Sequence, residues 1–182
     1  MCLEHDKHEH NRLGVSRRGF GSMLAGAAGL SLLPLAARAG TVDTLCVTCI
    51  DYRFVNRDVT WLNTELGLQF DNYDIVALAG GALAAIKTAV PQTTAGFWDQ
   101  IKIAISLHHI KKVVLVDHMD CGAYRVAYGT PPSNPQLPPA EELARHKIVM
   151  PQVAKLLQAA PYNLQASCYL MPLVGPPTAI PV

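Results

Sequence analysis

Charged residues are scarce in this 182-residue chain, at 16% of the total, and neither sign dominates, since 15 Lys and Arg face 14 Asp and Glu. Beyond residue 39 the balance is ten basic to eleven acidic residues. No basic stripe of the kind that binds nucleic acid remains there, so we expect no nucleic-acid partner. Residues 40–182, about 143 in number, suit one compact domain with an apolar core.

An uncharged apolar stretch lies near the N-terminus, at residues 19–37, directly after Arg17 and Arg18 and before Ala37-Arg38-Ala39. A basic segment, an apolar run and a small-residue cleavage site are the parts of an export signal, and paired arginines indicate the twin-arginine route. We predict a signal peptide over residues 1–39, recognition by the twin-arginine export machinery, and a periplasmic or secreted domain over residues 40–182. The alternative is a retained membrane anchor, because the run reaches about 18 residues.

Four of the five cysteines lie in the predicted domain, at positions 46, 49, 121 and 168. In an exported protein such cysteines could form disulfides. Cys46 and Cys49 also have the spacing of a thiol–disulfide pair. Redox pairs of this kind normally begin a helix, whereas Cys46 lies in a predicted strand, which argues against the redox alternative.

Short β-branched runs alternate with longer helical patterns after residue 43. This alternation predicts an α/β fold with a central parallel β-sheet of about four strands, flanked by helices. The predicted strands are residues 44–49, 73–78, 113–116 and 168–171. The predicted helices are residues 56–66, 93–110 and 141–158, the last kinked or split at Pro151. We expect an exposed loop over residues 129–139 and irregular structure over residues 175–182.

Chemically reactive side chains follow two of these strands, and a pair of glycines follows another. The first strand leads into Cys49, Asp51 and Arg53, the second into Gly80 and Gly81, and the third into His118 and Cys121. The carboxyl ends of parallel strands meet in one crevice, where open α/β sheets bind their ligands. Two thiolates and one imidazole form a zinc donor set that leaves a fourth position open. We therefore predict Cys49, His118 and Cys121 as ligands of one zinc ion per chain, with Cys121 favoured as a thiolate by the helix that follows it.

The motif Cys-x-Asp-x-Arg at residues 49–53 and the motif His-x-x-Cys-Gly at residues 118–122 resemble the two signatures of the β-class carbonic anhydrases. The likeness extends over residues 44–124. It implies a parallel sheet flanked by helices, zinc on Cys49, His118 and Cys121, and assembly into a homodimer or a larger homo-oligomer. It also implies reversible hydration of carbon dioxide to bicarbonate and a proton by zinc-bound hydroxide.

The same resemblance assigns Asp51 and Arg53 to the aspartate–arginine dyad of that family. Asp51 would accept a hydrogen bond from water on zinc, while Arg53 holds its carboxylate in a bidentate pair. If that pair breaks, Asp51 could become a fourth ligand and close the site.

Other residues near the motifs carry weaker predictions. Gly80 and Gly81 either admit the substrate closely or only turn the chain. Asp120 is expected to face solvent or to cap the next helix. Proton transfer could use any of His108, His109 and His146.

Two departures from the family pattern leave alternatives open. Tyr52 stands where the family commonly has a small hydroxyl residue, and Ala77-Leu78 where it usually has Arg-Asn. A more apolar channel at Leu78 would suit hydrolysis of carbon disulfide or carbonyl sulfide on the same fold. Besides this hydrolase and the thiol–disulfide protein considered above, the remaining alternative is a zinc-binding relative of the family that has no catalytic activity.

Overall fold

The computed structural model describes residues 42–69, 71–86, 91–130 and 136–182. The signal peptide predicted over residues 1–39 lies outside these ranges, so export stays a prediction. Within these ranges, no helix has the length and apolar character needed to cross a membrane.

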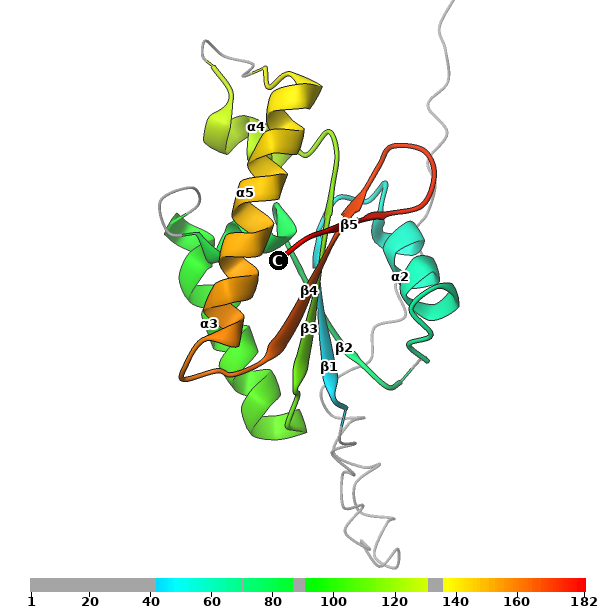
Figure 1. The fold of residues 1–182 in the computed structure, drawn as a ribbon, viewed down its shortest axis with the longest axis vertical. Helices are drawn as coiled ribbons and strands as arrows, with labels where there is room; N and C mark the ends of the chain where they lie inside the picture. Colours follow the sequence, from blue (N-terminus) through cyan, green and yellow to red (C-terminus); the bar gives the residue numbers. More distant parts are fainter. Residues whose placement is uncertain (1–41, 70, 87–90, 131–135) are drawn as a thin grey trace, which may run out of the picture. The chain divides into compact units, whose positions relative to one another are not determined.

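A five-stranded sheet in the order β2-β1-β3-β4-β5 forms the centre of the domain (Figure 1). Its strands are β1 (Thr44–Cys49), β2 (Asp74–Leu78), β3 (Lys112–His118), β4 (Gln165–Met171) and β5 (Thr178–Ile180). The first four strands are parallel to their neighbours, whereas β5 is antiparallel to β4. The predicted α/β fold with a central sheet flanked by helices is therefore confirmed. Four strands are parallel as predicted, and β5 adds an antiparallel fifth strand.

Helices cover both faces of this sheet (Figure 1). The helix α2 (Val55–Thr64) lies on one face, and α3 (Pro91–His108) and α5 (Pro139–Gln158) lie on the other. Two shorter helices, η1 (Gly81–Ala85) and α4 (Gly122–Tyr128), follow the carboxyl ends of β2 and β3. The larger core cluster packs on the side of α3 and α5, and a smaller one lies beneath α2.

The sequences of β1 and β3 explain why these strands are central. All six residues of β1 are buried, as are six of the seven in β3. Continuous apolar runs such as Val113–Val116 suit a parallel strand covered by helices on both faces. The edge strand β2 instead alternates between half-buried and exposed residues. This order brings the carboxyl ends of β1 and β3 side by side.

The C-terminal segment is more regular than predicted. Thr178–Ile180 forms β5 and pairs with residues 168–170 of β4, so the prediction of irregular structure over residues 175–182 is wrong there. The strand has only three residues and lies between Pro177 and Pro181. Such a short run between prolines shows no recognisable period.

The long helix α5 is not split at Pro151, contrary to one of the two outcomes predicted. It runs over 20 residues with Pro151 inside it. Proline removes one helical hydrogen bond, while Met150 and Val153 beside it are completely buried. Burial of this apolar face offsets the lost hydrogen bond and keeps the helix continuous.

Cys46 and Cys49 belong to different core clusters. Cys46 packs with Leu62 and Val114 beneath α2, whereas Cys49 belongs to the cluster on the opposite side. Successive side chains of a strand alternate between faces, so residues three apart point away from each other. All four cysteines in the described part of the chain are buried and free. This geometry excludes the thiol–disulfide alternative.

Candidate metal centre

The two adjacent central strands bring three metal-binding side chains together. Cys49 ends β1, His118 ends β3, and Cys121 is the N-cap of α4. All three are at most 4% exposed, and their donor atoms lie within 4.8 Å of one another. Among the residues that the structure describes, this is the group of His, Cys, Asp and Glu close enough to hold a metal ion. Two sulfurs and one imidazole nitrogen match a zinc donor set with one position left open.

The orientation of His118 fits a metal ligand. Its Nδ1 lies 2.9 Å from the carbonyl oxygen of Met119, a bond that fixes Nδ1 as the donor and leaves the lone pair on Nε2. The Nε2 atom is buried and has no hydrogen-bond partner within the described ranges. A buried polar atom without a partner is unfavourable. A metal ion held with Cys49 and Cys121 would satisfy it.

The pKa values of the two cysteine thiols are shifted in opposite directions. A hydrogen bond from the Cys121 thiol, supported by the Gly80 amide at 3.3 Å, lowers the pKa of Cys49 to about 4. The same hydrogen bond to Cys49 raises the pKa of Cys121. In this pair the pKa is therefore lowered at Cys49 and raised at Cys121. The thiolate form of Cys121 at the start of α4 stays a prediction for the metal-bound site.

Arg53 holds Asp51 beside the metal-binding group. Its Nη2 donates to Asp51 Oδ2 at 2.7 Å, and its Nε donates to Oδ1 at 3.0 Å. This hydrogen bonding lowers the pKa of Asp51 to about 2. Asp51 Oδ2 also lies 3.8 Å from His118 Nε2. The structure thus brings the Asp51–Arg53 pair to the same place as the three candidate metal ligands.

Asp120 extends this ion pair in a way that the sequence did not predict. Its carboxylate accepts a hydrogen bond from Arg53 Nη1 at 2.7 Å, and its carbonyl oxygen accepts one from Nη2 at 2.9 Å. The N-cap position of α4 belongs to Cys121 instead. Asp120 has a left-handed backbone, with φ of 60°, a conformation that Asp tolerates better than most residues. This backbone turns Asp120 back towards Arg53.

The Gly80–Gly81 turn lies next to the cysteines, and both residues have a left-handed backbone, with φ of 83° and 54°. A Cβ on Gly80 would come within 3.0 Å of the Ala123 side chain, and one on Gly81 would overlap the Asp117 carboxylate. Both positions therefore require glycine. Gly80 also lines the cavity beside the cysteines, whereas Gly81 packs against Asp117.

A cavity of about 190 Å³ opens onto this group. Its wall includes both sulfur-bearing residues, Cys49 and Cys121, and the carboxylate-bearing Asp51. Apolar side chains of Ile50, Ala79 and Ala123 complete much of the rest. A cavity of this size and character admits a small, weakly polar molecule and water.

His118 is supported from its other side by Phe54, which the sequence did not identify. The two rings stack with their centroids 4.0 Å apart, and Phe54 is only 1% exposed. Arg57 lies over the Phe54 ring at 5.1 Å and donates to the carbonyl oxygens of Leu173 and Gly175. In the sequence, the only indication of this role was that an apolar aromatic residue directly follows Arg53.

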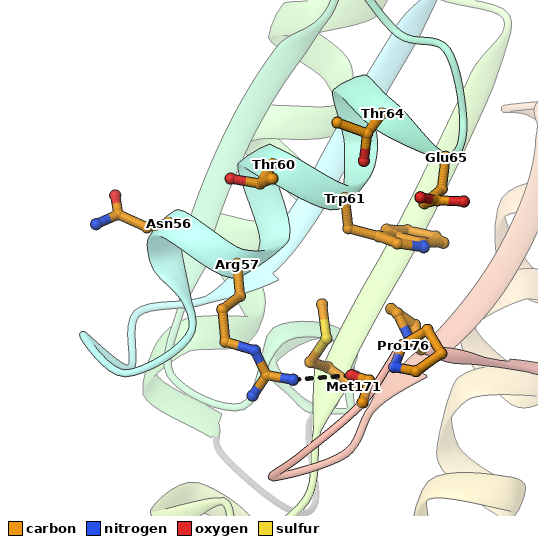
Figure 2. Close-up of a pocket in the computed structure, with 10 residues that line it drawn as sticks. Asn56, Arg57, Thr60, Trp61, Thr64, Glu65, Met171 and Pro176 are labelled. Carbon is orange, nitrogen blue, oxygen red and sulfur yellow. Dashed lines mark hydrogen bonds between the residues drawn. The ribbon is translucent and has the colours of Figure 1, made fainter.

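Figure 2 shows Arg57 reaching from α2 towards Met171 and the segment around Pro176. These residues line a groove of about 330 Å³, together with Trp61 and other residues of α2. Met171 is paired with His118 across β3 and β4. The groove therefore borders His118 through Met171, and Arg57, which lies over the Phe54 ring, connects the two from α2.

Comparisons with known proteins identify a family and agree with this fold. A family model described as "Putative carbonic anhydrase" matches residues 40–160. An uncharacterized protein of Rickettsia conorii is 32% identical over 133 residues, which cover 73% of this chain and 69% of that protein.

Two solved structures have a similar fold. One is from work on two tetrameric β-carbonic anhydrases of Sordaria macrospora; it has a TM-score of 0.57 and 15% identity, and the match covers 91% of this chain and 88% of that one. The other is the β-carbonic anhydrase CafA of Aspergillus fumigatus, with a TM-score of 0.53, 16% identity, and 81% and 79% of the two chains covered. At these identities the likeness establishes the fold alone.

Proposed function

Because this chain belongs to the family described as putative carbonic anhydrase, we propose that it is a zinc-dependent enzyme that hydrates carbon dioxide reversibly to bicarbonate and a proton. The observation that carries the proposal is the buried Cys49–His118–Cys121 group, whose donor atoms lie within 4.8 Å of one another. Metal binding alone would not need a bound carboxylate beside that group. Asp51, held by Arg53 at the same place, favours catalysis.

Cys49, His118 and Cys121 would hold one zinc ion per chain, which when bound lowers the pKa of water and supplies a nucleophile near neutral pH. Two thiolates and one neutral imidazole cancel the double positive charge of zinc. Neighbouring groups must therefore favour the deprotonated nucleophile more strongly than in a site with three imidazoles.

Asp51 is the group positioned to do this. Because Arg53 lowers its pKa to about 2, Asp51 is a carboxylate at neutral pH and accepts hydrogen bonds without donating any. In the cavity wall it would orient a water molecule towards the substrate and favour removal of the water proton. The pair with Arg53 also restrains Asp51 from joining the three metal-binding residues. Its release would let Asp51 close the site.

The cavity supports a small, linear, weakly polar substrate. Ile50, Ala79 and Ala123 line it beside the cysteines, and its volume of about 190 Å³ leaves little room for a larger molecule. This apolar wall also favours a second candidate, the hydrolysis of carbonyl sulfide or carbon disulfide. Both are linear triatomic molecules like carbon dioxide, so substrate assays must decide between them.

One experiment tests the activity directly. Residues 40–182 are purified, loaded with zinc, and assayed by stopped flow for hydration of carbon dioxide and in parallel for hydrolysis of carbonyl sulfide, with Cys121→Ser as the control. We expect rapid hydration that the control lacks. A zinc-loaded protein that acts only on carbonyl sulfide would transfer the proposal to the second substrate. A zinc-loaded protein that acts on neither carbon dioxide nor carbonyl sulfide would refute both proposed activities and leave only zinc binding.

Export and assembly complete the proposal. We propose that the twin-arginine pair Arg17–Arg18 directs the folded protein to the periplasm or beyond, which fits a protein that acquires its metal before export. Replacement of both arginines by lysine should keep it in the cytoplasm in a fractionation experiment. We also propose assembly into a homo-oligomer, which is supported by the similar fold of a Sordaria macrospora β-carbonic anhydrase that is described as tetrameric.

A further inference from the structure

A buried carboxylate binds the loop that carries Cys121. Glu142, on α5, accepts hydrogen bonds from the backbone amides of Cys121 at 2.7 Å and Asp120 at 3.0 Å. Its side chain is 4% exposed. One side chain thus fixes two successive peptide groups, including the amide of a metal-binding residue. It holds the chain at the point where Asp120 has its left-handed backbone.

A second buried carboxylate binds the opposite wall of the site. Asp117 Oδ1 accepts a hydrogen bond from the Ala82 amide at 2.8 Å, and Oδ2 accepts one from the Tyr124 hydroxyl at 2.8 Å. Ala82 directly follows the Gly80–Gly81 turn, whose Gly80 amide donates to the Cys49 sulfur. Asp117 therefore fixes the turn that contacts the first cysteine.

His146 lies between these two carboxylates. Its Nδ1 is 3.3 Å from Asp117 Oδ2, and its Nε2 is 3.8 Å from Glu142 Oε1. The imidazole is completely buried. The three side chains form one polar unit behind the site, and that unit contacts the Cys121 loop on one side and the Gly80 turn on the other.

We propose that Glu142, His146 and Asp117 act as a positioning unit for the metal centre. The unit sets the separation of the Cys49 and Cys121 sulfurs, and through Asp120 it also sets the position of Arg53. This inference rests on the proposed metal site but not on the reaction catalysed there.

The burial of three ionisable groups supports a positioning role. Replacing buried charged groups by apolar side chains of similar volume is often neutral or stabilising, so stability alone does not account for such a cluster. The hydrogen bonds of this cluster end on the Cys121 amide and on the Ala82 amide, two residues after the Gly80 amide that donates to the Cys49 sulfur. Groups that orient metal ligands in this way typically alter metal affinity by about 10- to 100-fold when changed.

Glu142→Gln tests the unit with little change of shape. The amide keeps one acceptor oxygen but presents an NH₂ group to the other backbone amide, so one hydrogen bond becomes a clash between donors. His108→Gln is the control for loss of a histidine–carboxylate pair away from the site, because His108 forms a half-buried pair at 2.6 Å with Asp74, the first residue of β2. Zinc affinity is measured by competition with a chromogenic chelator, and the thiolate-to-metal absorption bands are recorded after cobalt substitution.

We expect Glu142→Gln to weaken zinc binding by roughly 10-fold or more and to shift the cobalt bands, while His108→Gln changes neither. Unchanged affinity and an unchanged spectrum in a folded Glu142→Gln protein would overturn the inference.

If that variant does not fold, Tyr124→Phe provides a second test, because it removes only the hydroxyl bound to Asp117. It should weaken zinc by roughly 5-fold, and an unaltered affinity there overturns the inference equally. A wild-type protein that binds no zinc would instead refute the metal site itself.

Discussion

The Phe54 ring stacks on the His118 imidazole, with centroids 4.0 Å apart and ring planes inclined by 20°. His118 is thereby held from two directions, because Met119 fixes its Nδ1. The remaining nitrogen, Nε2, is left without a hydrogen-bond partner in the described part of the chain. An aromatic residue that follows Arg53 thus contacts a candidate metal ligand 64 positions away.

Phe54→Leu should weaken zinc binding, because it keeps an apolar side chain but removes the stacking that orients His118. A stacked aromatic pair contributes about 0.5–1.5 kcal/mol beyond its buried area, which corresponds to a loss of roughly 2- to 10-fold in affinity. Chelator competition measures the change. Phe97→Leu is the control, since Phe97 is equally buried at 1% but contacts Trp98 on α3. Equal effects of the two substitutions would contradict a specific role for Phe54.

Asp51→Ala should lower carbon dioxide turnover by roughly 100-fold or more, as expected when a group that directs proton transfer is removed. Zinc content should stay the same, because Asp51 is bound by Arg53 and lies outside the three-residue group. Asp99→Ala, which removes an exposed ion pair with Lys102, is the control. Full turnover by Asp51→Ala with unchanged zinc would refute the assigned role.

Removal of metal should expose one unusually reactive cysteine. The pKa of Cys49 is lowered to about 4 by the hydrogen bond from Cys121, so Cys49 is a thiolate at pH 6. Burial raises the pKa of Cys46 and Cys168 to about 12, which keeps both as thiols.

Alkylation at pH 6 in the presence of a chelator, followed by peptide mass mapping, should therefore label Cys49 first. Zinc added before the reagent should protect it. Labelling of all four cysteines at one rate, with or without zinc, would be inconsistent with this assignment.

Asp58 should make stability depend on pH. Burial raises its pKa to about 7, so the folded protein binds a proton that the unfolded chain releases near pH ~4. Folding is then favoured most at low pH, and this contribution is lost as the pH rises from about 4 to 7, by at most on the order of 4 kcal/mol.

Urea unfolding at pH 5 and pH 8, with a chelator present, measures this dependence. Asp58→Asn has no charge to bury, so its stability should fall less than that of the wild type between the two values. Asp99→Asn, at an exposed position on α3, should follow the wild type. A wild type and an Asp58→Asn variant with parallel pH profiles would show that Asp58 is not responsible.

Much of the fold could be predicted from the sequence, because its signals are local. The predicted limits of β1, residues 44–49, agree with the structure, since a run of β-branched and apolar residues gives a clear strand pattern. The grouping of Cys49, His118 and Cys121 followed from one physical rule, that the carboxyl ends of parallel strands meet at one edge. The three-residue strand β5 has too few residues to show such a pattern.

The supporting residues could not be predicted, because their contacts depend on the folded backbone. Asp120 reaches Arg53 only through its left-handed backbone, which its sequence neighbours do not indicate. Glu142 and Cys121 are 21 residues apart, and the helix that carries Glu142 shows only an ordinary charged first turn, with Glu141 beside it. The spacing of residues along the sequence does not predict long-range contacts of this kind.

Zinc stoichiometry tests the central claim most directly. Residues 40–182 are purified, exposed to zinc, freed of excess metal, and analysed by native mass spectrometry beside Cys121→Ser and Cys168→Ser. Cys168 is also a buried free cysteine, but it is not part of the three-residue group. The account predicts about one zinc per chain in the wild type and in Cys168→Ser, and none in Cys121→Ser. A wild type that retains no zinc, or a Cys121→Ser variant that retains as much as the wild type, would contradict it.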